Sequence, residues 1–255
     1  MSATWTADEM MAVSAARRLR DGTVCFVGIG LPSKAANLAR RTHAPNCVLI
    51  YESGTIGAKP QHLPLSIGDG ELAETADAVV SVPEIFGYWL QAGRVDVGFL
   101  GAAQIDRYGN LNSTVIGEYE QPKVRLPGAG GAPEIAAHCR QTYVMLRQSP
   151  RAFVERLDFR STLGQGDGPG SRERFNYRGA GVTAVVTDLG VLEPDPVTCE
   201  LTMTGLNPGV SGDDVLEATG WDLRVAPDVE VLEPPRHAEL EVLRALEAAG
   251  EVGRS

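Results

Sequence analysis

VCFVGIGLPSKAANLARRTHAPNCVLIYE, residues 24–52, carries a strand, a glycine-rich turn, a helix and a second strand in close succession. The apolar run at 24–27 predicts a short buried strand, and Gly28 and Gly30 follow it where the chain must turn. Residues 33–43 are helical in pattern, and residues 47–51 are again apolar. A strand that follows another strand after a helical crossover is typical of a parallel sheet. We therefore expect an α/β fold around this unit.

The same alternation continues on both sides of this unit. Thr6 and Glu9 have the spacing of a capping box, which predicts a first helix that extends to Arg20. Short continuous apolar strands separated by helices favour a mainly parallel sheet with helices on both faces. We find no repeat and no linker, and expect residues 1–255 to form one domain with a C-terminal helix and tail from about 234. The other expected elements are strands at 78–82, 95–100, 142–148, 182–188 and 199–206 and helices at 83–92 and 133–140.

Composition excludes several classes of function. The 255 residues include 23 Lys and Arg against 33 Asp and Glu, so the formal net charge is −10, opposite in sign to that of proteins that bind nucleic acids or anionic membranes. No apolar run approaches the roughly 18 residues of a membrane helix, and the N-terminus lacks the pattern of a signal peptide. We expect a cytoplasmic protein with no nucleic-acid or membrane partner.

Common catalytic and metal-binding motifs are absent. The four cysteines are scattered without a CxxC pair, and the four histidines do not have the spacing of metal ligands, so we expect reduced thiols and no metal. The sequence also lacks GxxxxGK[ST], HExxH and GxSxG, and no glycine cluster completes GxGxxG. Chemistry must therefore come from less obvious residues.

Glu52 is the acidic residue in the most unusual place. It follows an apolar strand and stands at its carboxyl end, the edge of an open α/β sheet where ligand crevices form. A carboxylate partly removed from water is a candidate nucleophile or base, although a surface acid is the simpler interpretation of the pattern alone. The glycines at 128–131 are similarly ambiguous, since they predict either a plain turn or backbone N–H groups that bind an oxyanion or a phosphate.

Five ordered motifs resemble the class I coenzyme A transferases, in particular beta subunits of the glutaconate CoA-transferase type. The likeness runs to about residue 225, and it implies the fold of that family. It also implies a partner alpha subunit of related fold, an α2β2 assembly, and a site between the subunits. Coenzyme A would be part of the substrate, with no permanently bound cofactor. The motifs lie at 28–32, 52–54, 101–110, 128–132 and 187–192.

The resemblance assigns roles to individual residues. Glu52 matches the glutamate that attacks the acyl-CoA thioester and then holds CoA as a glutamyl thioester. Gly130 and Gly131 match the glycines whose amides stabilise the oxyanion, and Gln104 would donate to the substrate carbonyl or, equally, stabilise a turn. The remaining residues expected to contact substrate or CoA are Gly28, Gly30, Ser53 and Gly54.

The resemblance leaves the reaction open between three alternatives. Residues 51–86 and 128–140 are most similar to the beta subunits of hydrolases that open the last steroid ring in cholesterol degradation. We therefore expect an acyl-CoA hydrolase that cleaves a C–C bond, with Glu52 or an alpha-subunit carboxylate as the base. The first alternative is a transferase that moves CoA between dicarboxylic or keto acids through a glutamyl thioester at Glu52. The second alternative is a non-catalytic supporting subunit.

Overall fold

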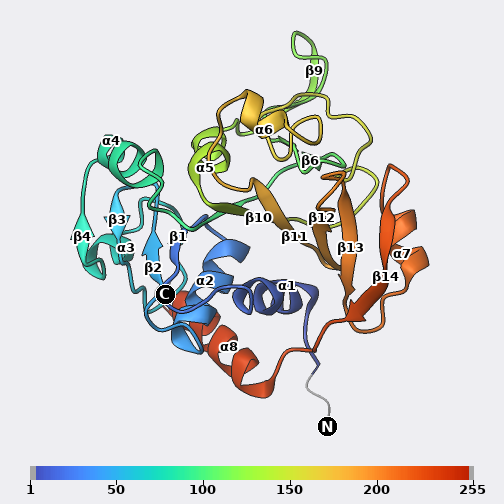
Figure 1. Ribbon diagram of the computed structural model, residues 1–255. Coiled ribbons are helices and arrows are strands. Elements are labelled where there is room, and N and C mark those ends of the chain that lie inside the picture. Colours follow the sequence, from blue (N-terminus) through green and yellow to red (C-terminus); the bar gives the residue numbers. More distant parts are fainter. Residues whose placement is uncertain (1–3, 253–255) are drawn as a thin grey trace. The chain divides into compact units, whose positions relative to one another are not determined.

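The computed structural model describes residues 4–252 (Figure 1). The chain forms two compact units. The first unit contains the chain up to Phe99 together with the segment from Pro234, and the second unit is Leu100–Glu233. The expected tail falls partly at residues 253–255, which lie outside the described residues. The expectation that the whole chain forms one domain stays a prediction.

The first unit is built around the strand–turn–helix–strand stretch. Its strands lie in the order β5-β1-β2-β3-β4. The pairs β1–β2 and β1–β5 are parallel, whereas β2–β3 and β3–β4 are antiparallel. The strands are β1 (Val24–Phe26), β2 (Val48–Ile50), β3 (Thr55–Ile56), β4 (Ala78–Val79) and β5 (Val97–Leu100), and the helices are α1 (Ala7–Ala16), α2 (Leu31–Arg41), α3 (Gly70–Glu74), α4 (Val82–Glu84), the π-helix η1 (Ile85–Leu90) and α8 (His237–Val252).

Helices α1, α2 and α8 pack on one another. The predicted capping box is present, because the Thr6 hydroxyl accepts from the Glu9 N–H while the Glu9 carboxylate accepts from the Thr6 N–H. Helix α1 ends at Ala16 rather than at Arg20, because the chain tightens into turns in which Arg18 and Leu19 donate to carbonyls three residues back. Glu9 also accepts two hydrogen bonds from Arg244, which fastens α8 to α1.

Replacing Glu9 with glutamine is expected to lower the free energy of unfolding by about 1 kcal/mol at pH 7. The Arg244 hydrogen bonds hold the pKa of Glu9 below its usual value of 4.5. Since the pKa is lowered on folding, the stabilisation is present above pH 4.5 and is lost as the pH falls through the folded pKa. Denaturant titrations from pH 7 to pH 3 should show the wild-type and variant stabilities converging in acid. The prediction would be contradicted if the difference in the free energy of unfolding between wild type and Glu9→Gln did not change with pH. It would also be contradicted if the control Glu118→Gln, at an exposed position, lowered the free energy of unfolding equally.

The second unit has strands in the order β14-β13-β12-β11-β10 and two small hairpins, β6–β7 and β8–β9. The pairs β10–β11 and β13–β14 are parallel, whereas β11–β12 and β12–β13 are antiparallel. Its elements are β6 (Gln104–Ile105), β7 (Leu111–Asn112), β8 (Val115–Gly117), β9 (Pro122–Arg125), α5 (Ala132–His138), β10 (Gln141–Met145), α6 (Ser171–Arg174), β11 (Val182–Val186), β12 (Gly190–Pro194), β13 (Leu201–Leu206), α7 (Gly212–Glu217) and β14 (Arg224–Val231).

The α/β class is confirmed, with a mixed sheet in which antiparallel strands extend the parallel ones. Most boundaries differ from the prediction by a few residues, and three elements differ more clearly. The strand expected at 199–206 begins at Leu201, because Cys199 has a φ of 62° and lies in a turn. The strand expected at 78–82 is only Ala78–Val79, and the helix expected at 83–92 is a short helix that continues as η1. Within residues 4–252 no helix is long and apolar enough to cross a membrane.

Candidate active site

Glu52 lies in a tight turn between β2 and β3. The Gly54 N–H donates to the Tyr51 carbonyl at 3.0 Å, and the Tyr51 N–H donates to the Thr55 carbonyl at 3.1 Å, so Glu52 and Ser53 form the tip. Strand β2 ends at Ile50, which confirms that Glu52 follows the carboxyl end of a parallel strand. The Glu52 side chain is half-buried and has no hydrogen-bond partner within the described residues. The carboxylate is therefore available to a ligand.

Tyr51 anchors this turn to helix α2. Its ring is fully buried, and its hydroxyl lies 3.2 Å from the Ser33 hydroxyl in the first turn of α2. Asn37 donates to the Ser33 carbonyl at 3.0 Å and extends this buried polar group. Burial raises the pKa of Tyr51, so the phenol stays neutral. The anchor fixes the residue that precedes Glu52.

The glycine turn of β1 meets the same edge as Glu52, because β1 and β2 are parallel. Gly28 follows β1, and Gly30 caps α2 with a φ of 86°, a conformation that favours glycine. The structure therefore brings Gly28, Gly30 and the predicted residues 52–54 to one edge of the first unit. Their roles in binding stay predictions.

Two hydroxyls beside Glu52 lack protein partners. The Ser53 Oγ and Thr55 Oγ1 atoms are buried, and neither has a hydrogen-bond partner in the part of the chain that the structure describes. Buried polar atoms are usually paired, so these two are candidates to bind a substrate oxygen or water. The sequence predicted Ser53 as a contact but missed Thr55, which an alternating strand pattern after Glu52 could have flagged.

The start of the long loop after β3 is anchored by contacts within the first unit. Arg41 of α2 donates to the carbonyls of Pro60 at 2.8 Å and Gln61 at 2.9 Å. Lys59 pairs with Asp77, and Glu71 accepts from the Gln61 N–H. These contacts hold the start of the loop against its own unit.

Gln104 is fully buried in the second unit and joins two segments. Its amide donates to the Asp158 carboxylate at 3.1 Å, and its carbonyl accepts from Asn112 at 2.7 Å and from the Asp158 N–H at 3.2 Å. These bonds join the β6–β7 hairpin to the chain at residue 158. The turn-stabilising role is therefore the one that the contacts favour, while a bond to substrate stays a prediction.

Gly130 and Gly131 precede helix α5. Gly130 has a φ of 52°, and a side chain there would meet nothing within 4 Å, so the loop faces open space. Their two N–H groups have no acceptor among residues 4–252. Unpaired backbone donors next to open space are the type of group that can stabilise an oxyanion. They lie in the second unit, whereas Glu52 lies in the first.

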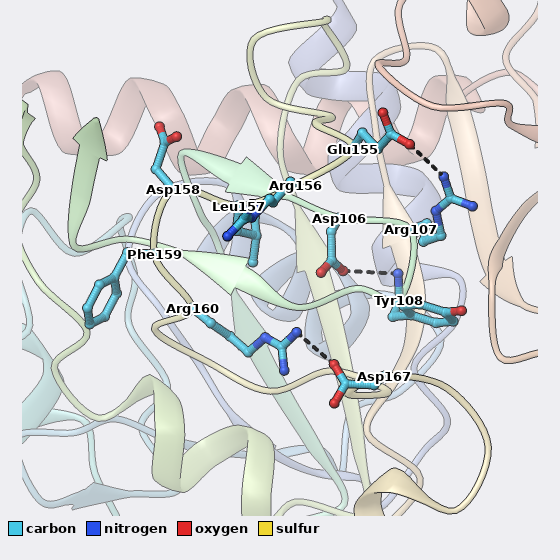
Figure 2. Close-up of a pocket in the computed structure, with 10 residues that line it drawn as sticks. All are labelled: Asp106, Arg107, Tyr108, Glu155, Arg156, Leu157, Asp158, Phe159, Arg160 and Asp167. Carbon is cyan, nitrogen blue, oxygen red and sulfur yellow. Dashed lines mark hydrogen bonds and ion pairs between the residues drawn. The ribbon is translucent and has the colours of Figure 1, made fainter. Parts of the chain in front are cut away.

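A cavity of about 330 Å³ opens in the second unit (Figure 2). Asp158, the partner of Gln104, lines it. Most of its charges are already compensated. Glu155 pairs with Arg107 at 3.5 Å, Asp167 pairs with Arg160 at 2.9 Å, and the other lining residues are Asp106, Tyr108, Arg156, Leu157 and Phe159.

Arg156 is the arginine of this cavity that forms no ion pair with a described residue. Asp106 accepts from Asn110 and from the Tyr108 N–H, and Asp158 accepts from Gln104 and from the Gly117 N–H. Burial raises the pKa of Asp106. Arg156 forms no ion pair with any described residue, so it can bind an anionic group beside the rings of Tyr108 and Phe159. The sequence did not single out Arg156, because no motif contains it and the cavity is formed in part by Asp106, Arg107 and Tyr108, which are distant along the chain.

Comparisons with known proteins extend over nearly the whole chain. A family model described as Coenzyme A transferase matches residues 8–218. One subunit of the 3-oxoadipate CoA-transferase of Pseudomonas knackmussii is 60% identical over 96% of this chain and 94% of that protein. The crystal structure of glutaconate coenzyme A-transferase from Acidaminococcus fermentans is 37% identical, with a TM-score of 0.91 over 97% of this chain and 96% of the other.

The expectation of a steroid-ring hydrolase is wrong. The cholesterol ring-cleaving hydrolase IpdB subunit of Mycobacterium tuberculosis is 27% identical over 94% of both chains, far below the 60% shared with a transferase subunit. The stretches that suggested the hydrolase, 51–86 and 128–140, contain the Glu52 turn, β3, β4 and α5 and lie within the residues that match the coenzyme A transferase model, so they do not distinguish a hydrolase from a transferase. A shared scaffold does not carry the reaction with it.

Proposed function

The chain belongs to the coenzyme A transferase family, and from this premise we propose that it is the beta-type subunit of a transferase that moves CoA to and from 3-oxoadipate. The relative at 60% identity supports this substrate, since its name specifies 3-oxoadipate. A six-carbon dicarboxylic keto acid also agrees with the dicarboxylic or keto acids expected for a transferase. That relative is itself one subunit of its enzyme, which supports a second, alpha-type subunit as the partner.

The observation that carries the proposal is the tip of the Glu52 turn, with an unpaired carboxylate between two anchored strands. In the proposed mechanism this carboxylate attacks the thioester carbonyl and the C–S bond breaks. The products of this step are an acyl-glutamyl anhydride at Glu52 and the free CoA thiolate. The thiolate then attacks the glutamyl carbonyl and releases the donor acid, so that CoA is held as a glutamyl thioester. The acceptor acid reverses both steps and leaves as its CoA ester.

Each attack on a carbonyl places negative charge on its oxygen. The family resemblance assigns the stabilisation of this charge to the N–H groups of Gly130 and Gly131, and within the second unit neither N–H has an acceptor among the described residues. A well-placed donor of this kind typically contributes about 3 kcal/mol to the transition state. Ser53 and Thr55 supply two further hydroxyls beside Glu52 for the substrate carboxylate.

Intact mass spectrometry tests the proposal. The chain, co-expressed with its second subunit, is incubated with succinyl-CoA and then with 3-oxoadipate. The expected result is a CoA adduct that maps to Glu52 and disappears when the acceptor acid is added. Turnover without any adduct, or hydrolysis in the absence of an acceptor, would overturn the proposed mechanism.

Replacing Arg156 with alanine is expected to raise KM for the acyl-CoA about tenfold and to leave kcat unchanged. We propose that the Arg156 guanidinium binds a phosphate of CoA. This ion pair would be equally strong in the enzyme–substrate complex and in the transition state, so its loss weakens binding without slowing the chemical step. Steady-state kinetics with varied acyl-CoA measures both constants. Arg151→Ala is the matched control, since Arg151 is exposed in the same connection but does not line the cavity. An unchanged KM in Arg156→Ala would show that the cavity does not bind CoA.

An α2β2 stoichiometry and a cytoplasmic location complete the proposal. Both rest on the family resemblance and on the sequence. Size-exclusion chromatography with light scattering on the co-expressed complex measures the stoichiometry. A mass other than that of two copies of each subunit would contradict the first.

A further inference from the structure

The glycine turn at 28–30 and the Glu52 turn leave neighbouring strands at the same edge of the sheet, because β1 and β2 are parallel. The last backbone hydrogen bond between these strands is donated by the Val27 N–H to the Ile50 carbonyl at 2.8 Å. Beyond it, no hydrogen bond in the described part of the chain joins residues 28–30 directly to residues 51–54. The backbone ladder alone therefore does not fix one turn against the other.

A contact between two side-chain hydroxyls continues the connection where the ladder ends. The Ser33 hydroxyl, in the first turn of α2, lies within hydrogen-bond distance of the Tyr51 hydroxyl, at 3.2 Å. Helix α2 begins directly after Gly30, and Tyr51 directly precedes Glu52, so each hydroxyl belongs to a residue next to one of the turns. Figure 1 shows β1, β2 and α2 next to one another. We call this contact between Ser33 and Tyr51 the hydroxyl bridge.

Neither side chain of the hydroxyl bridge is open to a substrate. Tyr51 is 0% exposed and Ser33 is 1% exposed. Burial raises the pKa of Tyr51, so the phenol acts through its hydrogen bond and not through a charge. Any effect of the bridge on a reaction must therefore pass through the backbone that each residue shares with its turn.

The hydroxyl bridge is not the arrangement that stability alone would favour. Asn37, one helical turn after Ser33, donates to the Ser33 carbonyl, but its buried Oδ1 atom has no partner within residues 4–252. A phenylalanine packed on alanines would fill such an interface without removing polar groups from water. Hydrogen bonds are directional, however, and a buried one fixes the position of a catalytic group more precisely than apolar packing does. The bridge is therefore suited to holding the two turns in place.

We propose that Ser33 and Tyr51 are positioning residues for CoA transfer. The hydroxyl bridge holds the Glu52 turn at a fixed distance from the glycine turn, so that the Glu52 carboxylate meets the carbonyl of a substrate bound at Gly28 and Gly30. This inference rests on the proposed function for the role of Glu52 as the nucleophile. A displacement of about 1 Å at a reacting group can lower a rate 10²-fold, so the smaller movements that the bridge prevents should change kcat by about tenfold.

Three variants test the proposal in the enzyme co-expressed with its second subunit, which are Tyr51→Phe, Ser33→Ala and the double variant. Each single variant is expected to lower kcat about tenfold and to change KM by less than about twofold, because neither hydroxyl contacts the substrate. Each also leaves one buried hydroxyl without its partner, so the Tm should fall.

The double variant separates positioning from stability. It removes both hydroxyls, so its Tm should recover towards that of the wild type. Its kcat should stay as low as that of the single variants, since the same contact is lost in all three. If the bridge only stabilised the fold, kcat would recover together with the Tm.

Tyr143→Phe is the matched control. Tyr143 is a buried tyrosine of β10 in the second unit, and its hydroxyl donates to the Gln141 side chain at 3.2 Å. The substitution removes a hydrogen bond from a buried tyrosine without touching either turn, so kcat should be unchanged. The rate at which CoA becomes attached to Glu52, followed by quenched-flow mass spectrometry, should fall with kcat in the bridge variants and stay unchanged in the control.

Wild-type kcat in both single variants, a raised KM with an unchanged kcat, or recovery of kcat in the double variant would overturn the inference. So would an equal loss of kcat in Tyr143→Phe. The proposed function has its own test in Glu52→Gln. Normal turnover of Glu52→Gln would reject the proposed function, whereas an inactive Glu52→Gln beside fully active bridge variants would reject the positioning role alone.

Discussion

Replacing Glu52 with glutamine is expected to lower kcat for CoA transfer by at least about 10³-fold. The amide has nearly the size of the carboxylate, but its carbonyl oxygen is a poor nucleophile and cannot form the anhydride. The carboxylate has no hydrogen bond to a described residue, so the turn should keep its shape. Steady-state kinetics and the mass of the complex after incubation with acyl-CoA measure the loss of turnover and of the CoA adduct.

Two controls separate this result from a structural effect. The Tm and the co-purification of the second subunit should be unchanged in Glu52→Gln. Glu120→Gln, at an exposed position of the second unit, should retain full activity. If Glu52→Gln turned over normally in an assembled complex, the chain would be a supporting subunit, and the nucleophile would have to belong to its partner.

Local patterns predicted the parts of the fold whose interactions are themselves local. The capping box of Thr6 and Glu9 joins residues three apart, so it could be recognised directly and is present. The apolar runs around Gly28 and before Glu52 likewise predicted β1, β2 and the position of Glu52 at the end of a strand. The coarse family assignment is confirmed as well.

Interactions between distant segments could not be predicted in this way. Strand β14 is largely exposed and lacks an apolar run, and it forms because its backbone pairs with β13. The first residue of β12, Gly190, has to be glycine because the backbone of Gly205 approaches it closely. A Cβ at position 190 would lie 2.1 Å from the Gly205 carbonyl oxygen. No local pattern records that proximity.

The same limit applies to the candidate site. The cavity around Arg156 is closed by pairs such as Arg107 with Glu155, whose partners are 48 positions apart by residue number. The choice between a substrate-binding and a turn-stabilising role for Gln104 depends on its hydrogen bond to Asp158. The two residues are far apart in the sequence, so no motif could link them. The choice between hydrolase and transferase failed for a related reason, since local likeness over the scaffold outweighed similarity over the whole chain.

Replacing Gly54 with alanine is expected to destabilise the protein by about 3 kcal/mol and to lower its Tm by roughly 10 °C. Gly54 has a φ of 106°, which side chains disfavour, and an added Cβ would lie 2.0 Å from the Val80 carbonyl oxygen. That contact is to backbone, so relief requires β4 and the Glu52 turn to move apart. A displacement of about 1 Å at a catalytic group can cost 10²-fold in rate.

Gly22→Ala separates backbone strain from the steric clash. Gly22 has a φ of 78°, but a side chain there would meet nothing within 4 Å. We expect it to cost only about 1 kcal/mol and to leave activity unchanged, because strain alone acts there. Thermal unfolding and kcat, measured on both variants in the assembled enzyme, give the difference. Equal effects of the two substitutions would mean that Val80 does not constrain the turn, and that the position of Glu52 does not depend on the contact between Gly54 and the edge strand.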